Sequence, residues 1–193
     1  MKNVGFARRR EKAVHTKDKL YAAADRLFSQ YGFDEVSVDA IVEEAGLSKG
    51  AFYVHFESKD SLAAALITDY VNKVDMDYKA FLDTLSPDQS AADILIALIV
   101  KIFDVIEHQI GCGRIRVLYK VQLTQTSHIQ SASSYGRALY TMLGNVLELG
   151  VSRGEFKASP SVEELTRHLI LAMRGLTYEW CIRYPDFDLK AQA

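Results

Sequence analysis

The chain has 193 residues, of which 49% are hydrophobic and 25% charged, and its formal net charge is −2. This balance is typical of a folded globular protein and excludes extensive disorder. The longest apolar run, residues 94–100, is far shorter than the roughly 20 residues that a membrane-spanning helix needs. Two cysteines cannot form a disulfide framework, and no Cys/His cluster has the spacing of a zinc site.

The first fifteen residues are basic and lack the apolar stretch of a secretion signal, so we expect a cytoplasmic protein. They carry five cations against the single carboxylate of Glu11: Lys2, Arg8, Arg9, Arg10 and Lys12. We interpret residues 1–15 as a basic flexible arm. Charge alone does not decide between an arm that binds phosphates and a solvated leader.

The apolar residues recur with a period of 3.6 along the chain, which predicts an all-α fold. The first helix is predicted from Thr16, a favourable N-cap residue, to Tyr31, before Gly32. Two short helices follow, one from Ser37 and one from Ser48. The connection Ala45-Gly46-Leu47-Ser48 between them has the spacing of a helix-turn-helix.

A long helix is predicted from Ser58 to about Leu85, which makes it a strut between residues 16–60 and a larger domain, residues 61–193. The larger domain is predicted to contain four further helices, over residues 91–110, 114–128, 132–153 and 160–183. The last of these begins either at Ser159-Pro160 or at a capping box formed by Ser161 and Glu164.

Residues 37–62 read SVDAIVEEAGLSKGAFYVHFESKDSL. This stretch resembles the DNA-binding head of the TetR/AcrR family of bacterial transcriptional regulators, with agreement over about residues 16–62. Ser37 stands where threonine is commoner, and Val42 where alanine is commoner. The resemblance implies an N-terminal three-helix head joined by a long helix to a C-terminal helical bundle that dimerises. It also implies a sequence-specific DNA-binding regulator, with repression released by a small-molecule effector as the default.

The start of the second short helix would enter the major groove of double-stranded DNA. Residues of this helix, together with the cap of the preceding helix, suit contact with phosphates or bases. They offer hydroxyl groups, an ammonium group, close approach of the backbone or an aromatic ring, and they are Ser37, Ser48, Lys49, Gly50, Ala51 and Tyr53. The alternatives are capping for the serines, a tight corner for Gly50 and core packing for Tyr53. Phe52 and Phe56 are expected in the core.

The family resemblance also assigns His55 and Lys59 to the DNA backbone. A lone histidine in a short helix is often only a structural hydrogen-bonding group, and Lys59 could be a solvated residue of a first helical turn. A cation at a helix N-terminus is unfavourable without an anion nearby, which favours a phosphate partner for Lys59.

Two half-sites about 34 Å apart require a dimer, and the last two long helices carry apolar stripes suited to a four-helix bundle across a two-fold axis. The predicted dimer interface comprises Leu139, Met142, Leu143, Val146, Leu169, Met173 and Leu176. The alternative is that these stripes close the core of the single chain.

The resemblance implies an effector site among the C-terminal helices, where large side chains suit a lipophilic or cofactor-sized ligand. The candidates are Phe103, Ile106, His108, Tyr119, Leu123, Tyr140, Tyr178 and Trp180, and ordinary core packing is the alternative for each. The histidines are too scattered for a metal site, so no metal or cofactor is predicted. Cys112, between two glycines, could be an exposed thiol, and nothing beside it in sequence marks it as reactive.

An enzyme and a helical adaptor are the competing classes of function. The sequence has no glycine-rich phosphate loop, nucleophile elbow or HExxH motif, so we do not expect an enzyme. An adaptor or small-molecule-binding protein without a DNA role would need neither the face from Ser48 to Tyr53 nor the basic leader.

Overall fold

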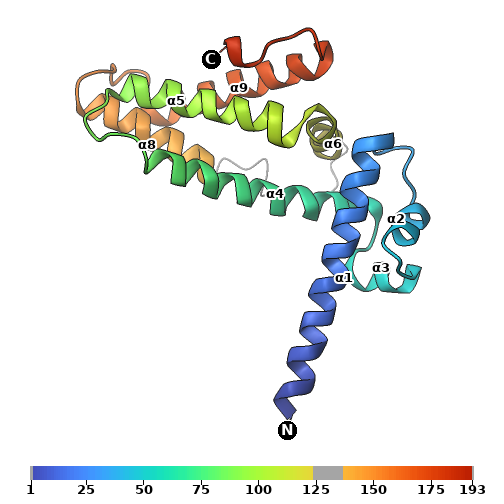
Figure 1. Ribbon diagram of the computed structural model, residues 1–193. Helices are drawn as coiled ribbons and strands as arrows, with labels where there is room; N and C mark the ends of the chain where they lie inside the picture. Colours follow the sequence, from blue (N-terminus) through green and yellow to red (C-terminus); the bar gives the residue numbers. More distant parts are fainter. Residues whose placement is uncertain (1, 124–136, 193) are drawn as a thin grey trace. The chain divides into compact units, whose positions relative to one another are not determined.

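The computed structural model describes residues 2–123 and 137–192 (Figure 1). Every regular element in these two ranges is helical, which confirms the all-α prediction. The described residues divide into two compact units, residues 2–67 with 117–123 and residues 68–116 with 137–192. The division along the chain falls after Ile67, beyond the boundary predicted near residue 60. Among the described residues, no helix combines the length and the apolar character that crossing a membrane requires.

The first unit holds the helix-turn-helix. It contains α1 (Lys2–Tyr31), α2 (Val38–Glu44), α3 (Lys49–His55) and the first turns of α4 (Lys59–Leu82). Helix α1 packs against both short helices. Leu20, Ile41, Phe52 and Leu62, one from each helix, are completely buried. Because α2 and α3 have only seven residues each, packing on this shared core must stabilise them.

Helix α1 differs from the prediction at its start, because it begins at Lys2 rather than at Thr16 and continues past α2 and α3 (Figure 1). The Thr16 hydroxyl donates a hydrogen bond to the carbonyl oxygen of Lys12, 2.8 Å away. This bond to the preceding turn is typical of threonine inside a helix rather than at its cap. No proline occurs before Pro87 to interrupt the helix.

The turn between α2 and α3 forms as its residues predict. The Ser37 and Ser48 hydroxyl oxygens cap the two helices by accepting hydrogen bonds from the backbone N–H groups of Ala40 and Ala51, at 3.1 and 3.2 Å. Gly46 has φ +63°, a conformation that favours glycine, and closes the corner after α2.

The second unit is built around the packing of helix α8 against its neighbours. Its further elements are α5 (Ala91–Asp104), a π-helical turn (Val105–Ile110), α6 (Cys112–Leu123), α8 (Ala138–Ser152), α9 (Val162–Arg183) and a 3-10 turn (Lys190–Gln192). Helix α8 packs against both α5 and α9. The last residues of α6 belong to the first unit. Leu98 of α5 and Leu143 of α8 are completely buried, as is Leu189 just before the final turn.

The ends of these helices refine the prediction. The predicted helix over residues 91–110 changes to π-helical geometry for its last six residues, and the N–H of Gly111 bonds to the carbonyl of Ile106 at 2.9 Å. Helix α9 begins with the capping box of Ser161 and Glu164. Residues 124–128 and 132–136 of the two other predicted helices lie outside the described residues.

Gly150 near the end of α8 is in close contact with Phe156. After α8 the chain turns at Gly154, where φ is +72°, and the N–H of Phe156 bonds to the carbonyl of Gly150 at 3.1 Å. A Cβ atom at Gly150 would lie only 2.1 Å from the Phe156 ring. The position therefore requires glycine.

Gly150→Ala should lower the free energy of unfolding by about 1–3 kcal/mol, because the added methyl group displaces the Phe156 ring. Urea denaturation at fixed protein concentration measures this loss. In a Phe156→Ala background the same substitution should cost much less, since the ring is gone. Equal losses in both backgrounds would contradict the contact.

Candidate DNA interface

The outward face of α3 carries Gly50, Tyr53 and Val54. The Tyr53 side chain is 56% exposed although Phe52, its neighbour in sequence, is completely buried. The two rings meet edge to face with centroids 5.3 Å apart. Phe56 is also buried, so the prediction that Phe52 and Phe56 belong to the core is confirmed. The contact with Phe52 therefore holds the Tyr53 ring in place, while much of the Tyr53 side chain stays exposed on the surface.

Val54 is a surface residue of α3 that the sequence did not single out. It is 79% exposed, more than any other large hydrophobic residue in the described chain. Its position four residues after Gly50, on the same helical face, was the signal that could have identified it. An exposed apolar group beside Tyr53 matches the methyl group that thymine presents in the major groove.

Lys49 at the start of α3 is paired with a carboxylate of the preceding helix. Its Nζ lies 2.7 Å from Oδ1 of Asp39, and both side chains are exposed. The hydrogen bond to Asp39 and the charge of that carboxylate raise the pKa of Lys49. The lysine therefore stays protonated and can exchange its exposed carboxylate partner for a phosphate or a guanine edge.

The remaining predicted residues of this surface lie around α3. Gly50 and Ser37 are exposed, Ser48 is exposed at the N-cap, and Ala51 and His55 are half-buried. The two serine oxygens accept capping bonds, which leaves each hydroxyl proton to donate to a phosphate oxygen. The His55 ring lies 6.3 Å from that of Phe56, at the edge of the core.

Lys59 occupies a different environment from the one predicted. Its ammonium group donates to the carbonyl oxygens of Phe33 and Val36, at 2.7 and 2.8 Å, and lies 3.4 Å from that of Asp34. It also lies 4.3 Å from the centre of the Phe33 ring. The cation at the start of α4 is thus stabilised by backbone carbonyls of the α1–α2 loop rather than directed toward a phosphate.

The residues predicted for a dimer interface are largely used inside the chain. Leu139, Leu143, Val146 and Met173 are buried, and Met142, Leu169 and Leu176 are half-buried. The stripe on α8 packs against α5 and α9 of the same chain. The four buried residues therefore fit the alternative, in which the stripes close the core of the single chain, because a buried side chain offers almost no surface to a partner.

The predicted effector residues are dispersed. Phe103, Tyr140 and Trp180 are buried, whereas His108, Leu123 and Tyr178 are exposed. Tyr119 and Leu123 belong to the first unit, apart from the other six. Among the described residues, no group of three or more His, Cys, Asp or Glu side chains could hold a metal ion.

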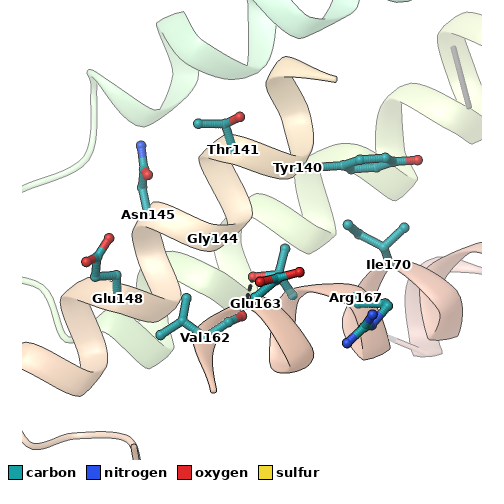
Figure 2. A pocket seen from close by; sticks show the side chains of 10 residues that line it. Tyr140, Thr141, Gly144, Asn145, Glu148, Val162, Glu163, Arg167 and Ile170 are labelled. Atoms are coloured by element: carbon teal, nitrogen blue, oxygen red, sulfur yellow. Dashed lines mark hydrogen bonds between the residues drawn. The ribbon is translucent and has the colours of Figure 1, made fainter. Parts of the chain in front are cut away.

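A groove of about 400 Å³ lies between α8 and α9 (Figure 2). Thr141, Asn145 and Glu148 border it from α8, and Glu163 and Arg167 from α9. Tyr140 is the one predicted effector residue that lines it, and its hydroxyl accepts a hydrogen bond from Arg174 at 2.5 Å. Most of the residues that line the groove have polar side chains, but apolar atoms form the larger part of its surface.

A buried ion pair joins α4 to the start of α8. The guanidinium of Arg137 donates to both carboxylate oxygens of Asp75, at 2.5–3.0 Å, and both side chains are largely shielded from solvent. Burial raises the pKa of neighbouring Tyr78 well above its usual range. No local sequence pattern predicts this pair, because its members lie 62 residues apart.

Residues 20–66 match a family model described as bacterial regulatory proteins, TetR family. The chain is 25% identical to the transcriptional regulator AcrR of Shigella flexneri, over 95% of this chain and 86% of AcrR. It is 24% identical to the transcriptional repressor KstR2 of Mycolicibacterium smegmatis, over 79% of this chain and 73% of KstR2. A Bacillus subtilis regulator is 38% identical over only 65 residues, 34% of this chain and 33% of that protein.

The fold resembles that of FadR from Bacillus subtilis, solved in complex with stearoyl-CoA. The TM-score is 0.70, the alignment covers 90% of this chain and 91% of FadR, and the sequences are 18% identical. At this identity the likeness concerns the fold alone.

Lys59→Met should lower the free energy of unfolding by about 1–3 kcal/mol, because the carbonyls of Phe33 and Val36 lose a charged donor. Urea denaturation measures the loss, and Lys49→Met is the matched control. The exposed pair of Lys49 with Asp39 should leave stability nearly unchanged. An equally stable Lys59→Met protein would contradict a structural role for Lys59.

Proposed function

The chain belongs to the TetR family of bacterial transcriptional regulators, and we propose that it is a repressor. It binds operator DNA as a homodimer through α3 and leaves the operator when a small-molecule effector binds. The relative KstR2 is a transcriptional repressor, which supports repression as the sign of regulation. The observation that carries the proposal is the outward face of α3, where Tyr53 and Val54 are exposed beside a buried Phe52.

Direct base contact by this face follows from its chemistry. A tyrosine hydroxyl can donate to a phosphate, the apolar Val54 side chain can contact a thymine methyl group, and Lys49 can donate to a guanine edge. Ser37 and Ser48 supply hydroxyl groups at the two helix caps. His55 remains a candidate backbone contact. Lys59 contributes indirectly, by holding the α1–α2 loop.

A homodimer is proposed through the exposed face of α9. Leu171, Gly175, Tyr178 and Ile182 are spaced four, three and four residues apart, so they share one face of the helix. The three large residues are each at least 50% exposed in the single chain. An apolar stripe on the surface suits a second copy of the same helix across a two-fold axis.

The effector is proposed to be a lipophilic small molecule bound in the second unit. FadR, whose fold the chain shares, binds stearoyl-CoA, so a long-chain acyl-CoA is the first class to test as an effector. If the effector binds one conformation of the protein more tightly than another, its binding changes the affinity of the protein for DNA.

Tyr53→Ala and Lys49→Ala should each weaken operator binding by about tenfold or more, because each removes a contact to base or phosphate. Fluorescence anisotropy with an operator obtained by genomic fragment selection measures the Kd. Lys73→Ala, in the exposed surface of α4 outside the first unit, is the charge-matched control and should not change the Kd. Unchanged affinity in both α3 variants, with the fold intact, would refute α3 as the reading helix.

Leu171→Glu should convert the dimer to a monomer, because two carboxylates would be buried against an apolar face. Light scattering should then report one chain mass, 21.7 kDa, instead of twice that value. Ile96→Glu on α5 is the matched control, since Ile96 is 54% exposed and Leu171 50%. A dimeric Leu171→Glu protein would place the interface elsewhere.

A further inference from the structure

The two cysteines, 69 residues apart in sequence, meet where α6 begins and α9 ends. Cys112 is the first residue of α6, and Cys181 lies in the last turn of α9. The Cys112 sulfur lies 4.0 Å from the Cys181 carbonyl oxygen, and both thiols are in the reduced, free form. Burial, together with the adjacent Cys112 thiol, raises the pKa of the Cys181 thiol to about 12. The two side chains are therefore direct neighbours.

The backbone on either side of Cys112 is uncovered, although the Cys112 side chain itself is buried. Gly111 and Gly113 flank Cys112, and a Cβ atom added to either glycine would meet nothing within 4 Å. Cys112 itself is 7% exposed. Burial keeps the Cys181 thiol protonated.

We propose that Cys112 and Cys181 form a reversible thiol–disulfide switch that responds to peroxides. The Cys112 thiol reduces hydrogen peroxide, gains one oxygen to become a sulfenic acid and releases one water. The Cys181 thiol then gives up its proton as its sulfur attacks the Cys112 sulfur, so that the S–S bond forms and the sulfenic hydroxyl leaves with that proton as a second water. In total, two thiols and one peroxide give one disulfide and two waters.

The disulfide would act on α6, the helix that carries Lys120. In the reduced protein, the α6–α9 junction is already held by Arg116, whose guanidinium donates to the Cys181 carbonyl oxygen at 2.6 and 3.2 Å. Two turns after Cys112, Lys120 pairs with Asp34 and lies 5.6 Å from the Phe33 ring, within the unit that holds α3. A covalent bond at one end of α6 can therefore change the support of the loop that the other end contacts.

The test of the pair uses the full chain, reduced and then exposed to hydrogen peroxide. Intact mass should show the loss of two hydrogen atoms, and peptide mapping should join the Cys112 and Cys181 peptides within one chain. Cys112→Ser and Cys181→Ala are the matched controls and should not lose two hydrogen atoms within one chain. Because the decisive comparison is between reduced and oxidised wild-type protein, it does not depend on how well either variant folds.

The regulatory part rests on the proposed function and has its own readout. Operator Kd should change by about tenfold on oxidation, within the usual range of allosteric coupling, and should return with dithiothreitol. Failure to form the internal disulfide, a link between chains, or oxygen gain without pairing would overturn the site. A disulfide that leaves the Kd unchanged would overturn the switch. Absence of operator binding by the reduced protein would instead refute the proposed function, while mass still decides the site.

Discussion

The complete burial of Phe52 is the constraint on which the outward face of α3 depends. Helix α3 has seven residues, too few to be stable without neighbours, so packing determines both its existence and its orientation. With the Phe52 ring in the core against α1 and α2, the next two residues, Tyr53 and Val54, must point outward. The serine caps at positions 37 and 48 define where the two short helices start.

The lysine side chains of the first unit lie in two distinct environments. Lys49 is exposed and paired with an exposed carboxylate, an arrangement that a phosphate can replace. Lys59 and Lys120 come from different helices and both contact the loop after α1, through Phe33 and Asp34. These two lysines stabilise the loop that connects α1 to α2. Charge in a nucleic-acid-binding unit therefore does not mark every lysine as a DNA contact.

In the second unit, helix α8 uses both of its apolar sides within the chain, against α5 and α9. On α9, exposed apolar side chains share one face of the helix, at Leu171, Tyr178 and Ile182. The groove between α8 and α9 runs beside the first turns of α9 (Figure 2). At the other end of α9, Cys181 contacts the start of α6. One helix thus combines a surface for a partner with a junction to α6.

The sequence by itself determined the all-α class, the two short helices, their serine caps and the turn at Gly46, because these depend on residues a few positions apart. The inward direction of Phe52 and Phe56 followed from the same local spacing. Only the tertiary structure decided the environment of Lys59, the pairing of Asp75 with Arg137 and the meeting of Cys112 with Cys181. It also assigned the stripe of Leu139 and Leu143 to the core. A buried apolar or charged side chain needs a contact partner. Local periodicity predicts which face of its helix the residue occupies, but not which distant segment of the chain packs against that face.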